Sequence, residues 1–552
     1  MRFKIHFILF LALCNALQAQ DHLLESQSVK DGYVDKISYA PGDTATVYIN
    51  AVNAVSNFRL FLYDEGKKIA DTLYADIFPQ VVSNAKPYEE GYGYKPTFKY
   101  VIPRVPSGVY RLGSAIGFII RDSTGSRPIT VLLPTNTNAA YNNNGGKSLY
   151  SFNSSDSQAS RVVSFLRPRK YGQDAELIRW MKARGFHDHQ VISDIDMNDT
   201  SLFFRSKVLV VQGHSEYWSR QARLNFDRFV KSGKDALILS GNTMWWHVRY
   251  SADMSRMICF KNYDLDTVSD PLLRTGEWPN EKLGYSVVKS IGVDYLHGVY
   301  LNKYPQGQSS YVVVEPGSPL FEGTGMMAGD SLWTQSYEFD GCPIKGVSPE
   351  GIPIPDYKIP GFSRYEFLGF NRGPTPMGPV PGSSKPPTFG MLTVMQRNDH
   401  EGRIINMGAH TWSIQGSGMF GSDSTVLGKI TQNALEKLLQ GKEVFSPNAF
   451  YDPNIHVSQS VMKPGSYAYS YIKDGKGFIR FAMASGQKVS VDLIDFKGLV
   501  VKNVFRNYAV ENMECDIELS EDLLPSGLYL YRIYGEDQVM TGKLVLNGSE
   551  FR

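Results

Sequence analysis

Hydrophobic and polar residues alternate along residues 29–130. The alternation is clear in 36–52, 58–66 and 106–122, and Gly and Pro residues separate these stretches. A period of two places every second side chain on one face of a strand, so each stretch predicts a strand with one buried face. Short strands at regular spacing are typical of two packed sheets. We therefore predict an immunoglobulin-like β-sandwich domain over residues 29–130.

A different pattern begins near residue 131. VLVVQG (208–213) and ALILSGN (236–242) are continuous apolar runs, and SRQARLNFDRFVKSG (219–233) between them has the period of an amphipathic helix. Ser219 is the expected N-cap of this helix, and Gly233 is its expected end. Apolar strands joined by a helix are typical of parallel sheets that are covered on both faces.

Further elements extend this pattern to residue 443. Helices are predicted at 175–186 and 425–441, and another buried strand is predicted at 403–410. The fold class predicted for 131–443 is an α/β core with a glutamine-amidotransferase-like or flavodoxin-like parallel sheet. Residues 447–552 alternate again, so we predict that N-terminal and C-terminal β-sandwich domains flank this core.

One stretch inside the core follows neither pattern. Residues 341–387 are rich in Gly and Pro, as in GIPIPDYKIPGF and RGPTPMGPVPGSSKPP. A loop of this length within a domain is usually functional or disordered. We expect it to cover the site, and a plain insertion is the alternative.

The first 19 residues have the composition of a secretory signal peptide. Arg2 and Lys4 precede the apolar run FILFLAL, and the segment ends in ALQA. The run is too short to cross a bilayer, and no later stretch reaches the ~18–20 apolar residues that a membrane helix needs. We expect a protein that is secreted or displayed at the cell surface and has no transmembrane segment.

Composition and charge indicate a globular protein and argue against some kinds of binding partner. The chain of 552 residues is 42% hydrophobic and 12% aromatic, which is typical of a globular protein with several domains. Without the two cationic residues of the signal, the 57 Lys and Arg fall to 55 and equal the 55 Asp and Glu. A net charge near zero argues against nucleic acid as the main partner. Cys259, Cys342 and Cys515 fit neither a metal-binding motif nor a disulfide framework and are expected to be buried thiols.

Polar side chains follow the two apolar runs of the core. GHSEYW (213–218) comes after the first run, and SGN (240–242) ends the second. Ligands bind beyond the carboxyl ends of parallel strands, so His214, Glu216 and Asn242 should meet at one edge if the two strands are neighbours. Four aromatic residues are expected to wall this crevice with apolar surface: Tyr217, Trp218, Trp245 and Trp246.

Several established templates do not fit this cluster. The sequence has no HExxH zinc motif, no GxxxxGK[ST] phosphate loop and no GxSxG nucleophile elbow at these strands. No Cys lies at either strand end to serve as a nucleophile. A structural alternative is that Glu216 caps the following helix while His214 packs against Trp218. That alternative does not account for Asn242.

A series of motifs in fixed order carries a family resemblance. LLPTNTNAAYNNNGGKSLY, VSFLRP, ELIRWMKARGF, VLVVQGHSEYWS, LILSGNTMWWHVR and RMICFK follow one another between residues 132 and 261. Together they resemble the catalytic region of the large subunit of N,N-dimethylformamidase, over about residues 30–440. Near the C-terminus, LPSGLYLYRI and TGKLVLN resemble the sorting domain of the type IX secretion system, which implies that secretion machinery as a partner.

The first resemblance implies a mononuclear iron site held by two tyrosines and one glutamate. On this sequence the glutamate is Glu216, and the tyrosines are Tyr141 of the AYNN motif and Tyr110 of SGVY. Two phenolates and a carboxylate are hard anionic ligands, which suit ferric iron. If the assignment holds, the three side-chain oxygens should converge within about 4–5 Å, since each bond to a shared metal is roughly 2 Å long.

The resemblance also implies the catalytic groups. His214 and Asn242 would stand beside the metal, and Glu338 of SYEFDG would be an outer acid. Glu216 could also take a proton from water. The implied function is a secreted, metal-dependent amidohydrolase that cleaves a small N-alkyl amide with iron-activated water. The alternative is a surface-displayed protein on the same fold that binds glycans or peptides without catalysis.

Two departures from the family bear on the substrate. The family enzyme has an additional amino-terminal β-domain and a separate small subunit, and it is cytoplasmic. An exported protein meets other amides, so dimethylformamide itself is not the expected substrate. A homo-oligomer is compatible with these features.

Overall fold

The computed structural model describes residues 25–113, 115–169, 175–301, 309–371, 388–414, 418–420, 425–452, 466–473, 476–495, 498–509, 514–519, 527–536 and 539–546. The chain divides into two compact units, Met1–Val457 and Ser458–Arg552. The predicted signal peptide lies outside the described residues. No helix in the described ranges is long and apolar enough to cross a membrane.

The amino-terminal part of the first unit consists of two sheets around one core. The smaller sheet has the order β1 (Val29–Val34), β3 (Thr44–Ala51) and β6 (Phe98–Val101). The larger has the order β2 (Ser38–Tyr39), β8 (Ile116–Ile120), β7 (Gly108–Leu112), β4 (Val55–Tyr63) and β5 (Ile69–Ile77). Ile49, Leu62 and Phe118 are among the side chains that both sheets bury in this core.

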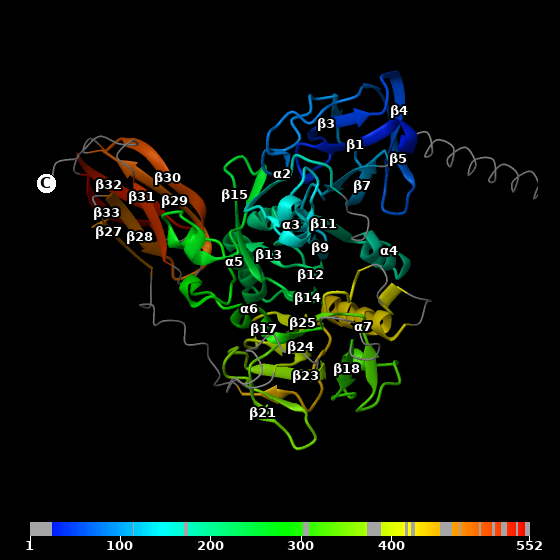
Figure 1. The fold of residues 1–552 in the computed structure, drawn as a ribbon. Coiled ribbons are helices and arrows are strands. Elements are labelled where there is room, and N and C mark those ends of the chain that lie inside the picture. Colours follow the sequence, from blue (N-terminus) through cyan, green and yellow to red (C-terminus); the bar gives the residue numbers. More distant parts are fainter. Residues whose placement is uncertain are drawn as a thin grey trace, which may run out of the picture. The chain divides into compact units, whose positions relative to one another are not determined.

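A mixed sheet of ten strands forms the centre of the first unit (Figure 1). Its order is β11 (His189–Ser193), β9 (Ile129–Leu133), β12 (Val208–Gly213), β14 (Asp235–Ser240), β25 (Arg403–Asn406), β24 (Gly390–Gln396), β23 (Arg364–Asn371), β18 (Ser310–Val313) and β19 (Ser331–Trp333), with β26 (Phe450–Tyr451) also paired to β23. The strands from β11 to β25 run parallel. From β25 onward each strand is antiparallel to its neighbour.

The predicted flavodoxin-like α/β core is wrong, because the fold is β-rich and assembled from several sheets. A doubly wound core needs a helix after each strand. Here many strands, not a single helix, lie between β14 and β25 in the chain, and β23 and β24 extend the large sheet in antiparallel fashion. Other strands of the first unit form smaller sheets. One consists of β13 (Tyr217–Ser219), β15 (Trp246–Tyr250), β16 (Arg256–Ile258) and β10 (Val162–Ser164), and another of β17 (Asp294–Tyr300) and β20 (Glu338–Gly341).

Local elements in this region follow the hydrophobic pattern closely. β12 has the predicted bounds and is buried throughout. The predicted helix between β12 and β14 is α5 (Arg220–Lys231), and its N-cap is Ser219, whose side chain accepts a hydrogen bond from the N–H of Ala222. The other helices are α2 (Pro87–Glu90), α3 (Thr135–Tyr141), α4 (Ala175–Ala183), α6 (Val288–Ile291) and α7 (Val426–Gln440).

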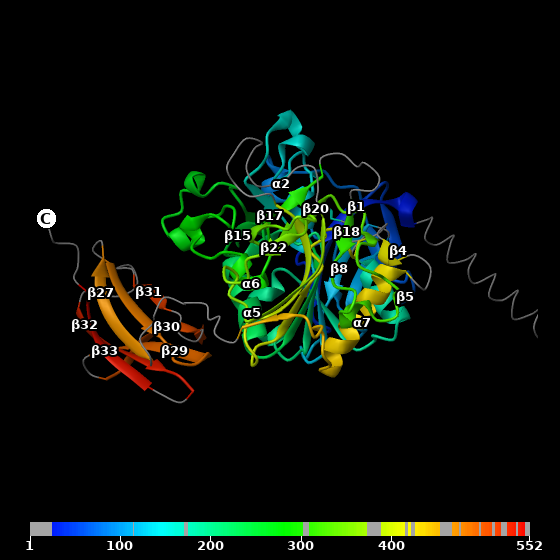
Figure 2. The ribbon, with the colours of Figure 1, turned by 90° about the horizontal axis from the view of Figure 1, so that it is seen from below.

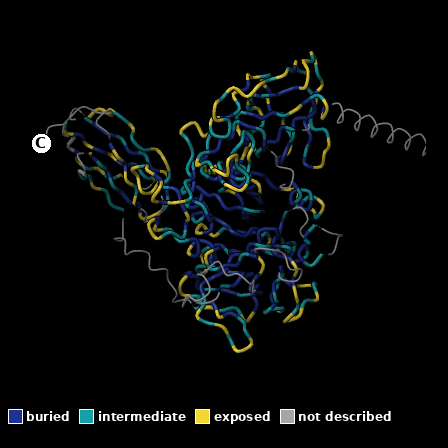
Figure 3. The backbone as a smooth tube through the Cα atoms, viewed as in Figure 1, coloured by how far each residue is buried: buried dark blue, intermediate teal, exposed yellow. Residues whose placement is uncertain are grey.

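The apolar strands are buried on both faces because helices pack on each side of the sheet. Val210 of β12 belongs to a core that includes Leu427 of α7, whereas Leu209 belongs to a core that includes Phe226 of α5. Figure 2 shows α5 and α7 on opposite sides of the central strands, and Figure 3 shows that these strands are the most buried part of the unit. Burial on both faces explains why β12 and β14 lack polar alternation.

The stretch predicted to be a loop cover contains regular structure. Its described part forms a hairpin of β21 (Ile344–Val347) and β22 (Pro353–Pro355), followed by β23. The loop prediction is therefore wrong for residues 341–371, and residues 372–387 lie outside the described residues. Gly and Pro at the hairpin obscured the strand pattern in the sequence.

The second unit contains two facing sets of strands. One sheet has the order β27 (Tyr467–Lys473), β28 (Lys476–Ala482) and β31 (Cys515–Leu519). The other has the order β30 (Val500–Ala509), β29 (Gln487–Ile494), β32 (Gly527–Tyr534) and β33 (Val539–Leu546). Phe481, Val491 and Tyr531 are buried in the core that the two sheets share.

Candidate metal and catalytic site

The carboxyl ends of three neighbouring parallel strands form the edge of the site. β12 pairs with β14, with Gly213 opposite Ser240, and β14 pairs with β25. The residues that follow these strands include His214, Asn242 and His410. Because the strands are adjacent and parallel, their following segments meet at one edge of the sheet.

Close packing of the backbone explains the glycine of the SGN motif. A Cβ atom on Gly241 would lie 2.5 Å from the backbone nitrogen of His410. Any larger residue would push the segment after β14 away from the segment after β25. Asn242 then adopts a left-handed φ of 53°, and its backbone N–H donates a 2.8 Å hydrogen bond to Oδ1 of Asp340.

Strand β20 brings Glu338 to the same edge. Phe339 forms an antiparallel bridge with Ala409, and the N–H of His410 donates to the carbonyl oxygen of Glu338 at 3.2 Å. Glu338 lies far from the GHSEYW motif in sequence. Its place at the site therefore depends on this pairing between β20 and the extension of β25.

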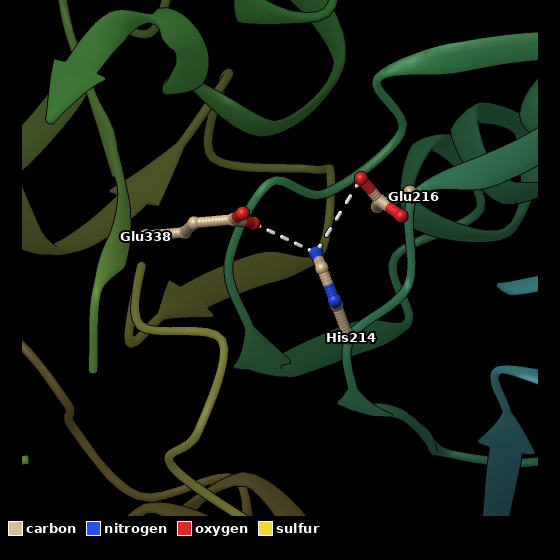
Figure 4. Close-up of side chains that lie close together, drawn as sticks. All are labelled: His214, Glu216 and Glu338. Carbon is tan, nitrogen blue, oxygen red and sulfur yellow. Dashed lines mark ion pairs between the residues drawn. The ribbon is translucent and has the colours of Figure 1, made fainter. Parts of the chain in front are cut away.

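One imidazole stands between two carboxylates (Figure 4). His214 Nε2 lies 2.8 Å from Glu338 Oε2 and 3.5 Å from Glu216 Oε1. Asn242 Nδ2 donates to Glu216 Oε1 at 2.8 Å and to Glu338 Oε2 at 3.1 Å, so one amide orients both carboxylates. Ligand atoms of His214, Glu216 and Glu338 lie within 4.8 Å of one another, which is close enough for a shared metal ion.

Two tyrosines complete the group, but one of them was not predicted. Tyr141 at the end of α3 has its ring 4.2 Å from the ring of Tyr150 and 5.9 Å from that of His214. The Tyr150 hydroxyl donates to Glu216 Oε2 at 3.2 Å, and the Tyr217 hydroxyl donates to that of Tyr150 at 2.7 Å. Tyr150 ends the quoted motif that also contains Tyr141, so the motif itself was the signal for it.

The structure does not bring Tyr110 to this group. Its side chain is buried in the core of the amino-terminal sheets, and its hydroxyl donates to the carbonyl oxygen of Pro106 at 2.7 Å. The sequence assignment of Tyr110 as a metal ligand is therefore corrected, and Tyr150 is the second phenol beside Glu216. A short SGVY pattern was not specific enough to identify a ligand.

The helix-capping alternative for Glu216 is also wrong. Ser219 caps α5, while the Glu216 carboxylate contacts Asn242 and Tyr150. Trp218 does not wall the site, since its ring packs 6.0 Å from that of Phe226 in the core beneath α5.

A half-buried lysine lies on the other side of Tyr150. Lys261 Nζ is 3.1 Å from the centroid of the Tyr150 ring and 4.8 Å from that of Trp246. Burial lowers the pKa of Lys261 to about 8, although the charge of Glu216 acts in the opposite direction. A cation over the ring face is attracted to the electron-rich ring and stabilises negative charge on the phenol.

The charges in the group are strongly interdependent. Burial disfavours a charged imidazole, but the Glu216 and Glu338 carboxylates outweigh it and raise the pKa of His214 to about 9. Burial likewise opposes charge on Glu338, but His214 outweighs it and lowers the pKa of Glu338 to about 2. For Glu216, burial dominates and raises the pKa. These shifts favour a cationic imidazole beside an anionic Glu338.

Two buried polar atoms of this group have no hydrogen-bond partner among the described residues. They are Nε2 of His214, whose close approach to Glu338 lacks hydrogen-bond alignment, and Oδ1 of Asn242. Such atoms are rare in protein interiors unless they serve a bound ion, water or substrate. Together with the phenols and carboxylates, they fit a centre that takes a hard metal ion and a polar ligand.

Comparisons with known proteins give one family for most of the chain. Residues 80–415 match the family described as N,N-dimethylformamidase beta subunit-like, C-terminal. Residues 474–547 match the secretion system C-terminal sorting domain, which belongs to the type IX system. No curated protein matches the chain.

One solved structure is similar only at a level that carries no argument. It is a cycloisomaltooligosaccharide glucanotransferase from Paenibacillus sp. complexed with cycloisomaltoheptaose, at 7% identity and a TM-score of 0.15, covering 89% of this chain and 98% of that one. The family match is therefore the basis for classification. The chain belongs to the N,N-dimethylformamidase beta subunit-like family and ends in a type IX sorting domain.

Proposed function

We propose that the protein is an exported, metal-dependent hydrolase of amide C–N bonds. The observation that carries the proposal is the convergence of His214, Glu216 and Glu338 with two phenols at one buried edge of the sheet. Membership of the dimethylformamidase-like family supports amide hydrolysis as the reaction. The sorting domain supports a secreted or cell-surface location and type IX machinery as a partner.

The residues that would hold the metal are Tyr141, Tyr150 and Glu216. All three are oxygen donors, and two phenolates with a carboxylate favour ferric iron. Iron held there would act as a Lewis acid that polarises an amide carbonyl and makes water more acidic. Lys261 against the face of Tyr150 would favour the anionic form of that phenol.

The remaining groups would move protons. Glu338 takes a proton as water adds its oxygen to the amide carbon, and protonated His214 gives a proton to the leaving amine nitrogen when the C–N bond breaks. The proton on Glu338 then returns to His214 across the 2.8 Å between Oε2 and Nε2. Asn242 keeps both carboxylates in place throughout. One water is consumed, and an acid and an amine are released.

Aromatic side chains favour a small amide with apolar substituents on nitrogen. Tyr141 and Tyr150 contribute ring faces, and Phe152, which is 73% exposed, lies 5.2 Å from the Tyr150 ring. A ring that is exposed yet packed against a site residue provides an apolar contact for substituents at the entrance.

The test combines metal content, absorption and turnover. Purified protein loaded with iron should contain about one iron per chain, show a phenolate-to-iron absorption band and hydrolyse members of a panel of N-alkyl amides. Glu216→Gln should lose the band and the activity while it stays folded. The matched control is Glu366→Gln, which changes another buried glutamate of the first unit, on β23. A folded wild-type protein without iron binding or amide turnover would contradict the proposal.

A further inference from the structure

A second buried imidazole faces the site and has no role in the scheme above. His410 follows β25, the third of the adjacent parallel strands, and is 2% exposed. Its ring lies 5.2 Å from that of His214 and 3.9 Å from that of Tyr337. It therefore borders the same group of charges as His214 but comes from a different strand.

Backbone geometry determines which nitrogen of His410 carries the proton. The N–H of Glu338 donates to His410 Nδ1 at 3.3 Å. This hydrogen is fixed by the peptide plane, so Nδ1 must present a lone pair to it. The hydroxyl oxygen of Ser336 is 2.7 Å from the same nitrogen and 2.8 Å from the carbonyl oxygen of Glu338, and in that tautomer its hydrogen turns toward Nδ1. The ring proton of neutral His410 is therefore on Nε2.

In this tautomer the Nε2–H of His410 is available as a donor. The hydrogen bonds that the ring forms with the described residues run through Nδ1, which is tied to the segment that carries Glu338. The two ring nitrogens point in nearly opposite directions, so Nε2 is directed away from that backbone.

The environment also favours the neutral imidazole. Burial lowers the pKa of His410 to about 3, and the neighbouring His214 acts in the same direction, although Glu338 opposes both.

We propose that His410 is a catalytic hydrogen-bond donor whose Nε2–H binds the substrate carbonyl oxygen. The inference rests on the proposed amide hydrolysis, and it gives the two histidines different roles in that reaction. As water adds to the carbonyl carbon, negative charge grows on this oxygen and the hydrogen bond from Nε2 strengthens. His410 neither gains nor loses a proton in the cycle, while His214 supplies the proton that leaves with the amine.

Two substitutions separate this role from a purely structural one. His410→Asn keeps an acceptor near the position of Nδ1 for the N–H of Glu338 but has no atom at the position of Nε2. His410→Gln reaches the position of Nε2 with an N–H but loses the acceptor for that backbone group. A structural role predicts that the Asn variant is the better enzyme, and a donor role predicts that the Gln variant is.

We expect His410→Asn to lower kcat by about 100-fold with little change in KM, as for other losses of an oxyanion donor. His410→Gln should keep most of the activity. Equal rates in the two variants, or a more active Asn variant, would show that His410 only anchors the segment with Glu338.

A binding measurement gives an answer that does not depend on turnover. Formate carries the planar carboxylate of an amide-hydrolysis product, and its binding to the iron-loaded protein can be followed by calorimetry. We expect His410→Asn to weaken formate binding and His410→Gln to preserve it. A crystal structure of the wild-type complex should place a formate oxygen about 2.7–3.2 Å from Nε2.

The outcomes distinguish the two proposals. If no amide is cleaved but formate binding depends on the donor at Nε2, amide hydrolysis is excluded and the assignment of His410 as a ligand donor survives. If amides are cleaved while formate avoids Nε2 and the two variants behave alike, the assignment of His410 is overturned. The wild-type crystal structure decides even if a variant fails to fold.

Discussion

Replacing Gly241 with Ala should damage both the fold and the site. The added Cβ would lie 2.5 Å from the nitrogen of His410, 2.9 Å from the carbonyl carbon of Ala409 and 3.0 Å from the carbonyl oxygen of Glu338. All three are backbone atoms, so no flexible side chain can move aside. The φ angle at Gly241 lies outside the left-handed region, and the effect is therefore one of steric overlap alone.

The geometry sets the size of the effect. Ordinary contacts of a Cβ begin near 3.4 Å, so the segments after β14 and β25 must separate by roughly 0.9 Å. Overpacking of this kind costs about 1–3 kcal/mol of unfolding free energy. The shift also moves Asn242 relative to Glu338, and a misplacement of about 1 Å can lower a rate by about 100-fold.

The assay compares Gly241→Ala with Gly346→Ala. Gly346 lies in β21, and a Cβ there would meet no atom within 4 Å, so this control adds the same methyl group without overlap. Urea unfolding should show the loss of stability in the first variant only, and iron content should fall in parallel. Equal stability and equal iron content in both variants would refute the packing argument.

Three further predictions concern single side chains. Tyr150→Phe removes one of the two phenols beside Glu216 and should weaken and shift the iron absorption band. Tyr110→Phe should keep the band and lose about 1 kcal/mol of stability; the reverse pattern would restore Tyr110 as a ligand. Burial raises the pKa of Asp340 to about 8, so the folded state binds this proton more tightly than the unfolded chain does. The stability of the wild-type protein should therefore fall as pH rises from about 4 to 8. Thermal unfolding of Asp340→Asn should not show this fall, and the same pH dependence in the variant would show that Asp340 does not cause it. Lys261→Met removes the cation from the face of Tyr150 and should shift the iron absorption band in wavelength, and an identical spectrum would show that the cation has no influence on the phenol.

The pattern of apolar and polar residues over short stretches of sequence was sufficient to predict individual strands and helices. β12 and α5 follow from continuous apolar runs, helical periodicity and a Ser at the N-cap, and each of these signals lies within about a dozen residues. The contact between Glu216 and Asn242 could be expected in the same way, because both follow strands that a single helix connects.

The fold class failed because strand pairing is a long-range property. An apolar run reports burial on both faces but not the direction of the neighbouring strand. The antiparallel half of the large sheet includes β24, β23, β18 and β19. It joins the parallel half where β24 pairs with β25, which lies well over a hundred residues after β14. Nothing within either run distinguishes that arrangement from a doubly wound sheet.

The sequence by itself identified His214, Glu216 and Asn242 as a polar group at one edge of the sheet, because polar side chains that follow buried strands need a partner or a ligand. Only the tertiary structure decided which of the 32 tyrosines join them. It buries Tyr110 in the amino-terminal sheets and brings Tyr150 to Glu216. It also places His410 beside His214, because the fold pairs β25 with β14, which in turn pairs with β12. Contacts between distant segments depend on how sheets assemble, and local sequence does not encode that assembly.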